Sequence, residues 1–533
     1  MSRMLNHFRN GRHTYHPLNL TLLLSVWFLA FVALAPVAFS QTLELEPEGC
    51  TSVLVGKLAS IDGSTMTSHS CDSGSDRTWI NIVPRQKHQP GATAKIYRRA
   101  KNTEKPSDHF DLMSEIPQVA ETYAFINTCY PVMNEYQLAI GETTCGGKRE
   151  LVSRQGKIDC PELYRLVLER AKTAREAIKV IDELTKEHGY NDVGECFTFA
   201  DPNETWHFEI LGPGKDRIGA VWAAVRIPDD HVGVSANSHR IRRIELSDSE
   251  NYLASDNVFS LAEEMGWWDP KSGQPFEFCY AYASRTSLGS RHREWSVLNA
   301  VAPSLNLNYA SENFPLSVKA EKKLSVADVL KMFRNYYQGT DLDMTRTMTT
   351  VDRDGNVVKS PVANPFMSSD MLKLLNIQRE RTVACSRATY VNVTQSRAWL
   401  PDAIGGVVWL GYDNPATTPH TPFYCGISQM PEAYLLDGRR DFSRDCAWWA
   451  FRRVSKLADL QFETISKEIE QVWRKLEDQA FANQQKAEQE AARLYRQDPA
   501  AARKFLTDYS HRLANEAVDA YWKLGDSLWV KYL

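Results

Sequence analysis

The chain has 533 residues, of which 43% are hydrophobic and 24% are charged, and its formal net charge is -4. These values are ordinary for a globular protein, and the length suits a single large sheet enzyme with additions. Because the charges are spread without long runs of one sign, the sequence has no electrostatic footprint for DNA or RNA, and we expect no nucleic-acid partner.

Residues 1–40 have the features of a signal peptide. Three arginines precede residue 13, Leu18 to Ala35 is almost entirely apolar, and Ala38 and Ser40 are small residues at the two positions that a signal peptidase recognises. We expect cleavage before Gln41 and export to the periplasm or the medium. The alternative is an uncleaved anchor, because the apolar segment is nearly long enough to span a bilayer. No later stretch is long and apolar enough to do so, and no stable membrane association is expected after cleavage.

A short acidic segment, residues 41–49, separates the signal peptide from Cys50. We interpret it as a propeptide, the alternative being a flexible N-terminus of the mature chain. Its removal makes Cys50 the first residue, and a residue that carries both a thiol and a free α-amine is a nucleophile with its own base. Cys50 is therefore the predicted catalytic nucleophile. The glycine before it leaves the backbone unhindered, which suits self-cleavage by the thiol.

The residues after Cys50 predict a β-hairpin. Apolar residues alternate there, Asp62-Gly63 is a turn signal, and residues 65–70 are predicted to form the returning strand. Such a hairpin brings Asp72 back beside Cys50, where its carboxylate could hold and orient the new α-amine. The alternative for Asp72 is a surface turn residue in an acidic, serine-rich loop.

Strand and helix patterns follow one another along the rest of the chain. Their order is strands, then helices, then more strands joined by hairpins, which implies an α+β fold of antiparallel sheets with helices on their faces. The last segment, 448–533, is helical and charged, and we expect it to be a packing or homo-oligomer contact appended to a domain of residues 50–447. The predicted elements are strands at 123–130 and 136–144, helices within 161–189, strands at 196–200, 205–211, 218–227 and 232–236, a mainly helical section at 247–340, a hairpin at 351–358 and strands within 382–426.

Four further residues are candidates for contacting the reacting groups. Asn134 and Asn237 stand at the ends of predicted strands, where a side-chain amide or a nearby backbone N–H could donate to an oxyanion, a contribution of roughly 3 kcal/mol per donor. Asparagine at a strand end is otherwise a turn residue. Arg291 and Arg293 could bind a substrate carboxylate in a forked geometry, or be solvated charges. No HExxH or paired CxxC pattern occurs and the histidines are scattered singly, so no metal site is predicted.

Several blocks of the sequence resemble one known family. The run CTSVLVGKLASIDGST, which begins at Cys50, resembles the start of the dipeptidase A family of N-terminal nucleophile cysteine peptidases, relatives of the secernins. The resemblance covers roughly residues 50–449. It implies a four-layer αββα sandwich of the N-terminal nucleophile hydrolase type, autocatalytic exposure of Cys50, and hydrolysis of dipeptides with broad side-chain tolerance and no metal or other cofactor. The further blocks, in the family's order, are NEYQLAIGETTC, LYRLVLERAKTAREAI, ADPNETWHFEILGPG, SANSHRI, GTDLDMT and TQSRAWLP.

The wider superfamily includes penicillin V acylases and bile salt hydrolases. Resemblance to its pattern makes Cys50 the nucleophile and Asp72 the contact of its amine, with the Asn134 region and Asn237 forming the oxyanion hole. One position departs from the pattern, because many members carry an arginine three residues before that aspartate, in a block like ARNED, whereas this chain has His69. A titratable ring there replaces an always-charged fork, and His69 becomes a candidate for substrate binding.

We therefore expect an exported cysteine peptidase that hydrolyses dipeptides, with small peptides as its partners. Two alternatives stay open: an N-acyl amide hydrolase of the penicillin V acylase type, and an exported binding protein that keeps the fold without catalysis. A panel of dipeptides and acyl-amino acids separates the first alternative from the expectation. Labelling of Cys50 by a thiol-reactive probe separates the second.

Overall fold

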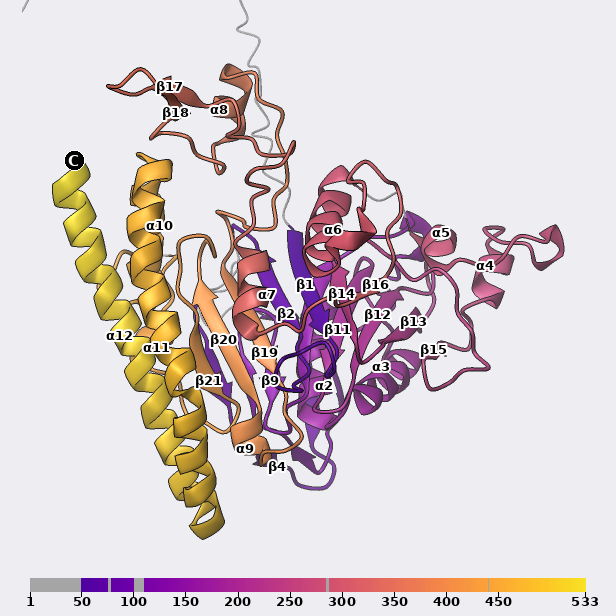
Figure 1. Cartoon of the computed structure of the whole chain (residues 1–533). Coiled ribbons are helices and arrows are strands. Elements are labelled where there is room, and N and C mark those ends of the chain that lie inside the picture. The colour runs from indigo at the N-terminus through magenta and orange to yellow at the C-terminus, as the bar shows by residue number, and fades with distance from the viewer. Residues whose placement is uncertain (1–48, 75–77, 100–109, 284–286, 440) are drawn as a thin grey trace, which may run out of the picture. The chain divides into compact units, whose positions relative to one another are not determined.

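The computed structural model describes residues 49–74, 78–99, 110–283, 287–439 and 441–533 (Figure 1). The predicted signal peptide and residues 41–48 of the predicted propeptide lie outside these described residues. Within the described ranges, no helix is long and apolar enough to cross a membrane.

Cys50 lies in the first of two large antiparallel sheets formed by the described residues. Its strand β1 lies between β14 and β2, and every residue of β1 and β2 is buried. The strand that carries Cys50 is therefore covered on both edges and both faces. In spatial order the seven strands are β16 (Ser317–Lys319), β14 (His231–Ser235), β1 (Gly49–Val55), β2 (Ser68–Asp72), β19 (Tyr390–Gln395), β20 (Val407–Tyr412) and β21 (Thr421–Tyr424).

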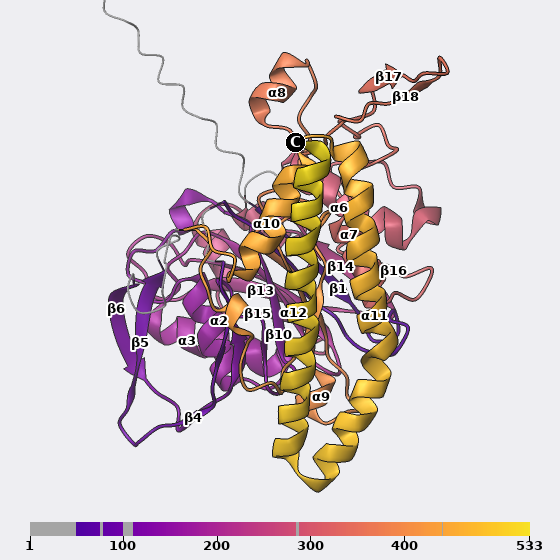
Figure 2. The same cartoon turned by 90° about the vertical axis from the view of Figure 1, so that its left-hand side faces the viewer.

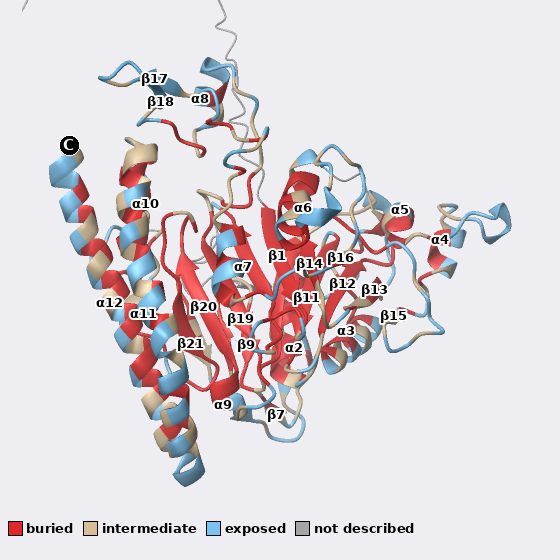
Figure 3. Ribbon diagram, in the orientation of Figure 1, coloured by how far each residue is buried: buried red, intermediate tan, exposed pale blue. Residues whose placement is uncertain are grey.

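The second sheet has eight strands within the described residues, and its β10 and β11 contact β1 of the first sheet. The strands of both sheets are buried along most of their length (Figure 3). In spatial order they are β15 (Tyr252–Ala254), β13 (Val221–Ile227), β12 (Thr205–Leu211), β11 (Glu195–Ala200), β10 (Ala139–Thr144), β9 (Met133–Asn134), β8 (Phe125–Asn127) and β3 (Asn81–Val83).

The two sheets approach closely at Gly141 in β10. A Cβ at this position would lie 2.2 Å from the carbonyl oxygen of Ser68 and 2.6 Å from Oγ of Ser52. Beside it, Oγ of Ser52 and Oγ1 of Thr198 are 2.5 Å apart and hydrogen-bonded. Because only glycine leaves room for this contact, Gly141 brings β10 and its next residue, Glu142, up to the hairpin that carries Cys50.

Helices α2 (Cys160–Arg170) and α3 (Ala174–His188) form one hydrophobic core with aromatic residues of β11 and β12. Within that core the rings of Phe197 and Phe208 are stacked at 5.6 Å between centroids. Helix α3 begins after Thr173, whose side chain accepts a hydrogen bond from the backbone N–H of Glu176. The predicted helical stretch 161–189 is therefore two helices with a cap between them.

A second core joins the first sheet to α6 (Leu288–Val301), α7 (Val326–Phe333) and the C-terminal helices. The latter are α10 (Ala447–Ala458), α11 (Phe462–Gln497) and α12 (Pro499–Tyr532), and α11 and α12 run side by side as a long antiparallel pair (Figure 2). Trp409 of β20 stacks on Phe481 of α11 with 4.2 Å between ring centroids. The C-terminal helices therefore cover strands of the first sheet.

The remaining described elements are short. They are the paired strands β4 (Gln86–Lys87) and β7 (Glu121–Thr122), β5 (Thr93–Arg99) and β6 (Phe110–Pro117), β17 (Thr349–Val351) and β18 (Val357–Lys359), the helices α4 (Ser260–Glu264), α5 (Phe278–Tyr282), α8 (Ser369–Leu374) and α9 (Asp402–Gly405), and the 3₁₀ turns η1 (Arg149–Leu151), η2 (Pro270–Ser272), η3 (Pro303–Leu305) and η4 (Glu432–Tyr434).

Several sequence predictions are confirmed at this level. The sheets are antiparallel with helices packed on them, the hairpin after Cys50 exists with Cys50 opposite Cys71, and residues 351–358 form the predicted hairpin β17–β18. The returning strand of the first hairpin is shorter than predicted, since β2 begins at Ser68 and the residues before it make only isolated bridges. Met66 still pairs with Val55 in the register of the hairpin, but between this bridge and β2 the hydroxyl of Ser68 bonds the backbone N–H and carbonyl of Val53 in place of ladder bonds.

One buried ion pair joins α11 to Arg334 at the end of α7, and it predicts a pH dependence of stability. Glu477 of α11 accepts hydrogen bonds from Arg334, with Nη2 to Oε1 at 2.5 Å, and from the backbone N–H of His420 at 2.8 Å. Burial alone raises the pKa of Glu477, but the charge of Arg334 and the contact with His420 outweigh it and lower the pKa to about 2. The pKa of Glu477 in the folded chain is below its pKa in the unfolded chain. The pair therefore stabilises the fold at pH values above the unfolded pKa, and this contribution is lost as the pH falls towards 2.

We therefore expect the Glu477→Gln variant to be less stable at neutral pH, by about 3 kcal/mol, because Arg334 is left buried without its partner. Its stability should also fall less steeply than that of the wild type between about pH 4.5 and 2. Urea unfolding followed by circular dichroism across this range measures both effects. The matched control is Asp478→Asn, which removes an exposed charge from the next position of α11; equal pH profiles for Glu477→Gln and the wild type would contradict the assignment.

Candidate active site

The backbone nitrogen of Cys50 is held by a side chain from the neighbouring strand. Ser52 of β1 pairs with Ser235 of β14. Cys50 lies two residues before Ser52 and Asn237 two residues after Ser235, and the backbone N–H of Cys50 donates to Oδ1 of Asn237 at 2.9 Å. Asn237 has a φ of 60°, in the left-handed region that asparagine tolerates better than other residues with a side chain. This backbone turn aims the amide of Asn237 back at Cys50.

Gly49 fits only because it lacks a side chain. A Cβ at this position would lie 2.6 Å from Oδ1 of Asn237 and 3.5 Å from Nη2 of Arg381. The peptide bond between Gly49 and Cys50 is thus enclosed by the amide that holds the nitrogen of Cys50 and by a guanidinium group.

Arg293, from α6, reaches the other side of Cys50. Its Nη1 donates to the carbonyl oxygen of Cys50 at 2.6 Å and to Oγ1 of Thr51 at 3.0 Å, and its Nη2 donates to Oδ1 of Asn237 at 2.9 Å. Burial, together with the positive charge of Arg381, lowers the pKa of Arg293 to about 10. It is still cationic at neutral pH, and it fixes the backbone of Cys50 and the amide that holds it.

Asp72 lies at the end of β2, directly opposite Gly49 in the ladder. Its Oδ2 accepts from Nη2 of Arg381 and from Oγ of Ser70, the latter at 3.1 Å, while its buried Oδ1 has no hydrogen-bond partner. The position that sequence analysis assigned to Asp72 is therefore confirmed as adjacent to the Cys50 backbone. One carboxylate oxygen there is unused in the uncleaved chain.

The thiol of Cys50 meets a second carboxylate, Glu142 of β10. Burial raises the pKa of the Cys50 thiol, and the negative charges of Glu142 and Asp72 raise it further. Oε2 of Glu142 lies 3.2 Å from Nε2 of His69, and both side chains are buried. Burial raises the pKa of Glu142, but the contact with His69 outweighs it and lowers that pKa overall. In this form of the chain, with no free amine at Cys50, the thiol is held protonated.

The structure places the ring of His69 next to the thiol of Cys50. Its Nδ1 lies 3.4 Å from the hydroxyl of Tyr390, and its ring packs edge-on against Tyr130 and Tyr390. The ring is thus fixed between aromatic residues with Nε2 towards Glu142. Sequence analysis found no arginine at position 69, and in the structure the guanidinium group that contacts Asp72 belongs to Arg381, more than 300 residues further along the chain.

Asn237 is beside Cys50 as predicted, but it presents a different atom. Its Nδ2 donates to the carbonyl oxygen of Thr144 at 2.8 Å, and its Oδ1 accepts from Cys50 and Arg293. An oxyanion needs a donor, and the side-chain donor of Asn237 is already used. In this arrangement Asn237 acts as an acceptor for the Cys50 nitrogen.

Asn134 is not brought to the thiol. Its Nδ2 donates to the carbonyl oxygens of Leu168 and Ala171 at 2.9 and 2.7 Å, and its Oδ1 accepts from the backbone N–H groups of Tyr136 and Leu138. The backbone N–H groups of residues 134 and 137 are also paired within the loop, and that of Glu135 donates to the carbonyl oxygen of Ala124. In this structure the side chain of Asn134 ties its loop to α2, and its two amide donors are used. That this region supplies an oxyanion donor stays a prediction.

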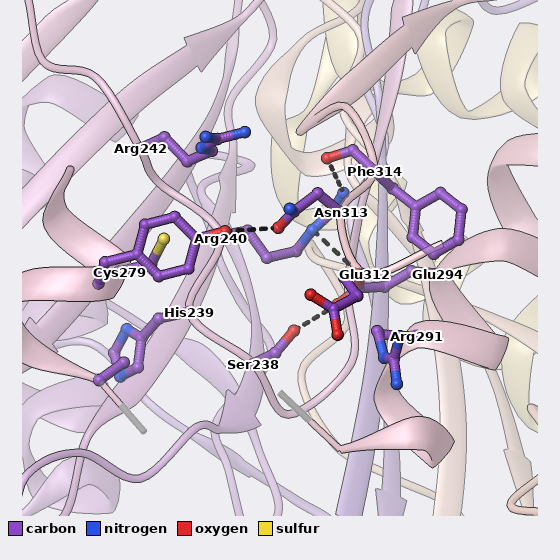
Figure 4. Close-up of a pocket in the computed structure, with 12 residues that line it drawn as sticks. Ser238, His239, Arg240, Arg242, Cys279, Arg291, Glu294, Glu312, Asn313 and Phe314 are labelled. Carbon is purple, nitrogen blue, oxygen red and sulfur yellow. Dashed lines mark hydrogen bonds and ion pairs between the residues drawn. The ribbon is translucent and has the colours of Figure 1, made fainter. Parts of the chain in front are cut away.

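Arg291 lies apart from Arg293 because two positions along a helix differ by about 200° around its axis. Its Nη1 donates to the carbonyl oxygen of Ser311 at 3.0 Å. It lines a cavity of about 250 Å³ bordered by Ser238, Arg240 and Glu294, shown in Figure 4. The cavity residues do not include Cys50, so of the two predicted arginines only Arg293 contacts the nucleophile.

Two residues of this site were missed by sequence analysis. Arg381 stands in a stretch without a recognisable pattern, and Glu142 lies within the block NEYQLAIGETTC, where a buried carboxylate in a strand is an unusual choice. That signal could have identified Glu142, since a charged residue is almost never fully buried unless it is paired. Nothing in the sequence near Arg381 indicates its contact with Asp72.

Together these groups can activate a thiol and stabilise negative charge. Arg293 and Arg381 place two guanidinium groups next to the backbone of residues 49 and 50, and Asp72 and Glu142 supply carboxylates on either side. Such a set suits nucleophilic attack by sulfur on a carbonyl carbon, with cations near the oxyanion that forms.

Comparison with known proteins agrees with this chemistry. The family model for peptidase family C69 matches residues 49–475, so that the match begins one residue before Cys50. A probable dipeptidase B of Streptococcus pyogenes serotype M1 is 24% identical over 463 residues, which cover 85% of this chain and 87% of the relative. A probable dipeptidase of Salmonella dublin is 28% identical over 401 residues, 71% and 81% of the two chains. Dipeptidase A of Lactobacillus helveticus is 22% identical over 432 residues, 78% and 83%.

The charge of Glu142 predicts the reactivity of Cys50. Since that negative charge raises the pKa of the thiol, the Glu142→Gln variant should have a lower thiol pKa and faster alkylation of Cys50 near pH 8. Labelling with iodoacetamide across a pH series, with the modified cysteine identified by peptide mass spectrometry, measures this. Glu142→Asp, which keeps the charge, is the matched control. The N-terminus of each sample is determined so that chains of the same form are compared, and an unchanged pH profile in Glu142→Gln would contradict the coupling.

Proposed function

We propose that this protein, which belongs to peptidase family C69, is a cysteine dipeptidase whose nucleophile is Cys50. The observation that carries the proposal is the convergence of Asn237, Arg293 and Arg381 on the Gly49-Cys50 peptide bond, at the residue where the family match begins. The names of the relatives, dipeptidase A and probable dipeptidases, support dipeptides as the substrate class.

Cleavage between Gly49 and Cys50 turns the amide nitrogen of Cys50 into an α-amine. That nitrogen is already held by Oδ1 of Asn237, and an ammonium group there has donors to spare. The unpartnered Oδ1 of Asp72, on the neighbouring strand, is suited to accept one of them. Maturation thereby creates the base of the reaction, the α-amine of Cys50, where Asn237 already holds the nitrogen. It also gives Oδ1 of Asp72 a hydrogen-bond donor that this buried oxygen otherwise lacks.

In the proposed reaction the α-amine of Cys50 accepts the thiol proton, and the thiolate attacks the scissile carbonyl carbon of the dipeptide. The negative charge that forms on the carbonyl oxygen is stabilised by the guanidinium group of Arg381, which lies beside residue 49. Arg293, whose five N–H groups already donate to neighbouring oxygens, holds the backbone of Cys50 in place. The protonated amine gives its proton to the leaving amino group, so that the C-terminal amino acid departs and a thioester remains. Water then attacks the thioester, its proton passes to the amine and back to sulfur, and the N-terminal amino acid is released.

The same proposal extends to the architecture and to export. The contacts between β1 and β10, the core that α2 and α3 form with one sheet, and the core that α6 and α7 form with the other support the four-layer αββα arrangement of N-terminal nucleophile hydrolases. Residues 448–533 are then a helical segment added to this sandwich. We also propose that residues 1–40 are a signal peptide, 41–49 a propeptide, and that the enzyme is exported. The sequence features of the first forty residues support this.

The maturation step predicts the mature N-terminus. Mass spectrometry of active protein should find Cys50 as the first residue, and an active chain that begins at Gln41 would reject the mechanism. The Gly49→Val variant should be cleaved much more slowly, because its side chain collides with Oδ1 of Asn237. Cys50→Ala is the uncleaved reference in the same experiment.

The nucleophile assignment predicts the activity of cysteine variants. Cys50→Ser should lose dipeptide hydrolysis by about 10³-fold or more, as expected when the attacking group is removed. The matched control is Cys446→Ser, which keeps a donor to the carbonyl oxygen of Leu436 and should retain full activity. Hydrolysis of acyl-amino acids in preference to dipeptides would assign the chain to the acylase alternative, and unchanged turnover in Cys50→Ser would remove Cys50 from the mechanism.

A further inference from the structure

Three side chains with metal-binding atoms meet at the thiol. They come from three strands: Cys50 from β1, His69 from β2 and Glu142 from β10. Sγ of Cys50, a ring nitrogen of His69 and a carboxylate oxygen of Glu142 all lie within 4.8 Å of one another, and all three residues are buried. Among the described residues, this is the one group of three such side chains that meets this distance.

The atoms that face the centre of this group make no hydrogen bond and contact only one another, while the outer atoms are hydrogen-bonded. Nε2 of His69 and Oε2 of Glu142 are buried without a hydrogen bond, although they lie 3.2 Å apart. On the far side, Nδ1 of His69 meets the hydroxyl of Tyr390 at 3.4 Å, and Oε1 of Glu142 accepts from Oγ1 of Thr144 at 3.0 Å. Buried polar atoms without a partner are uncommon, and ligands oriented by outer partners are characteristic of metal sites.

We propose that Cys50, His69 and Glu142 bind a zinc-like divalent cation, which blocks the nucleophile. Sulfur, imidazole nitrogen and carboxylate oxygen are the three ligand types that Zn²⁺ takes in proteins, and three protein ligands leave a fourth position for water. The Cys50 thiol loses one proton on binding, and its electron pair forms the bond to the metal. Thiolate, carboxylate and divalent cation then sum to no net charge, whereas without the metal the buried carboxylate of Glu142 has no full positive charge among these three side chains unless His69 is protonated.

Binding and inhibition are separate parts of this inference. Binding needs only the three side chains, which are in place while residue 49 is still attached, and so it does not depend on the activity. Inhibition rests on the proposed function, because sulfur coordinated to a metal cannot attack a carbonyl carbon. Metal would act on this peptidase as a reversible inhibitor rather than as a cofactor.

The first measurement follows metal binding without using activity. Purified full-length protein, cleared of metal with a chelator, is titrated with Co²⁺ as the probe. We expect one equivalent to produce the near-ultraviolet charge-transfer absorption of a cobalt–thiolate bond, and Zn²⁺ to abolish it by displacement. Cys50→Ala should lose this absorption. Loss of one ligand should weaken Zn²⁺ binding at least about tenfold in His69→Gln and Glu142→Gln, measured by competition with a chromophoric chelator.

The controls separate this site from other thiol–imidazole pairs in the chain. Cys196 and His207 lie 3.4 Å apart in the second sheet and are the strongest competing pair. Cobalt–thiolate absorption that persists in Cys50→Ala and disappears in Cys196→Ser would overturn the proposal. His231→Gln, a half-buried histidine bonded to Ser317, should bind metal like the wild type. Thermal unfolding by circular dichroism shows whether each variant is folded, and if His69→Gln is not, Glu142→Gln carries the test.

The second measurement concerns inhibition. Zn²⁺ added to active protein should abolish dipeptide hydrolysis, and the chelator should restore it. If hydrolysis is absent altogether while one equivalent of metal still binds in the titration, the proposed function fails and the metal site stands. If hydrolysis is present and Zn²⁺ neither binds with one-to-one stoichiometry nor inhibits, the metal site fails and the proposed function stands.

Discussion

The hydrogen bond from the backbone nitrogen of Cys50 to Oδ1 of Asn237 is the contact on which the site depends. It fixes the one atom that changes chemically when the preceding residue is removed, from an amide nitrogen to an amine. Everything else near it serves to hold this geometry: Arg293 bonds the same amide oxygen and the carbonyl oxygen of Cys50, and Thr144 holds the amide nitrogen. The nitrogen is therefore positioned before the chain is cut.

Positive and negative side chains surround this bond, and their arrangement explains why the pKa of the Cys50 thiol is raised in the uncleaved chain. Asp72 and Glu142 raise the pKa of Cys50 beyond the effect of burial. Arg381 neutralises Asp72, and His69 partners Glu142. An ammonium group at Cys50 adds a positive charge at the place where both carboxylates act, which favours the thiolate. A divalent cation does the same more strongly, and for that reason the site that activates sulfur also attracts metal.

The close packing of the two sheets is what makes this arrangement possible. Gly141 lets β10 approach the Cys50 hairpin, and the following residue, Glu142, is thereby buried against the thiol. Helix α6 contributes Arg293 from the other side, while its near neighbour Arg291 points into a separate cavity (Figure 4). A shift of β10 by one residue would turn Glu142 to the other face of its sheet, and a shift of α6 by one residue would rotate Arg293 about 100° away from Cys50. The register of β10 and of α6 therefore determines which charges lie near the sulfur.

The sequence by itself predicted Cys50 as the nucleophile, and it determined the proximity of Asp72 to Cys50 and the antiparallel order of strands. Cys50 and Asp72 are joined by a tight hairpin, and a turn signal with alternating apolar residues predicts their proximity because the contact is local. Asn237 was also predicted to lie near Cys50. Its role as an acceptor depends on whether the oxygen or the nitrogen of its amide faces Cys50, and the sequence pattern does not determine that orientation. The contacts of Asn134 with its own loop and with α2 were not predicted, because a strand-end asparagine that caps its own loop is indistinguishable in sequence from one that faces a substrate. Arg381 and Glu142 were decided by tertiary structure alone, since their contacts with Asp72 and Cys50 join segments far apart in the chain and depend on the spacing of two sheets.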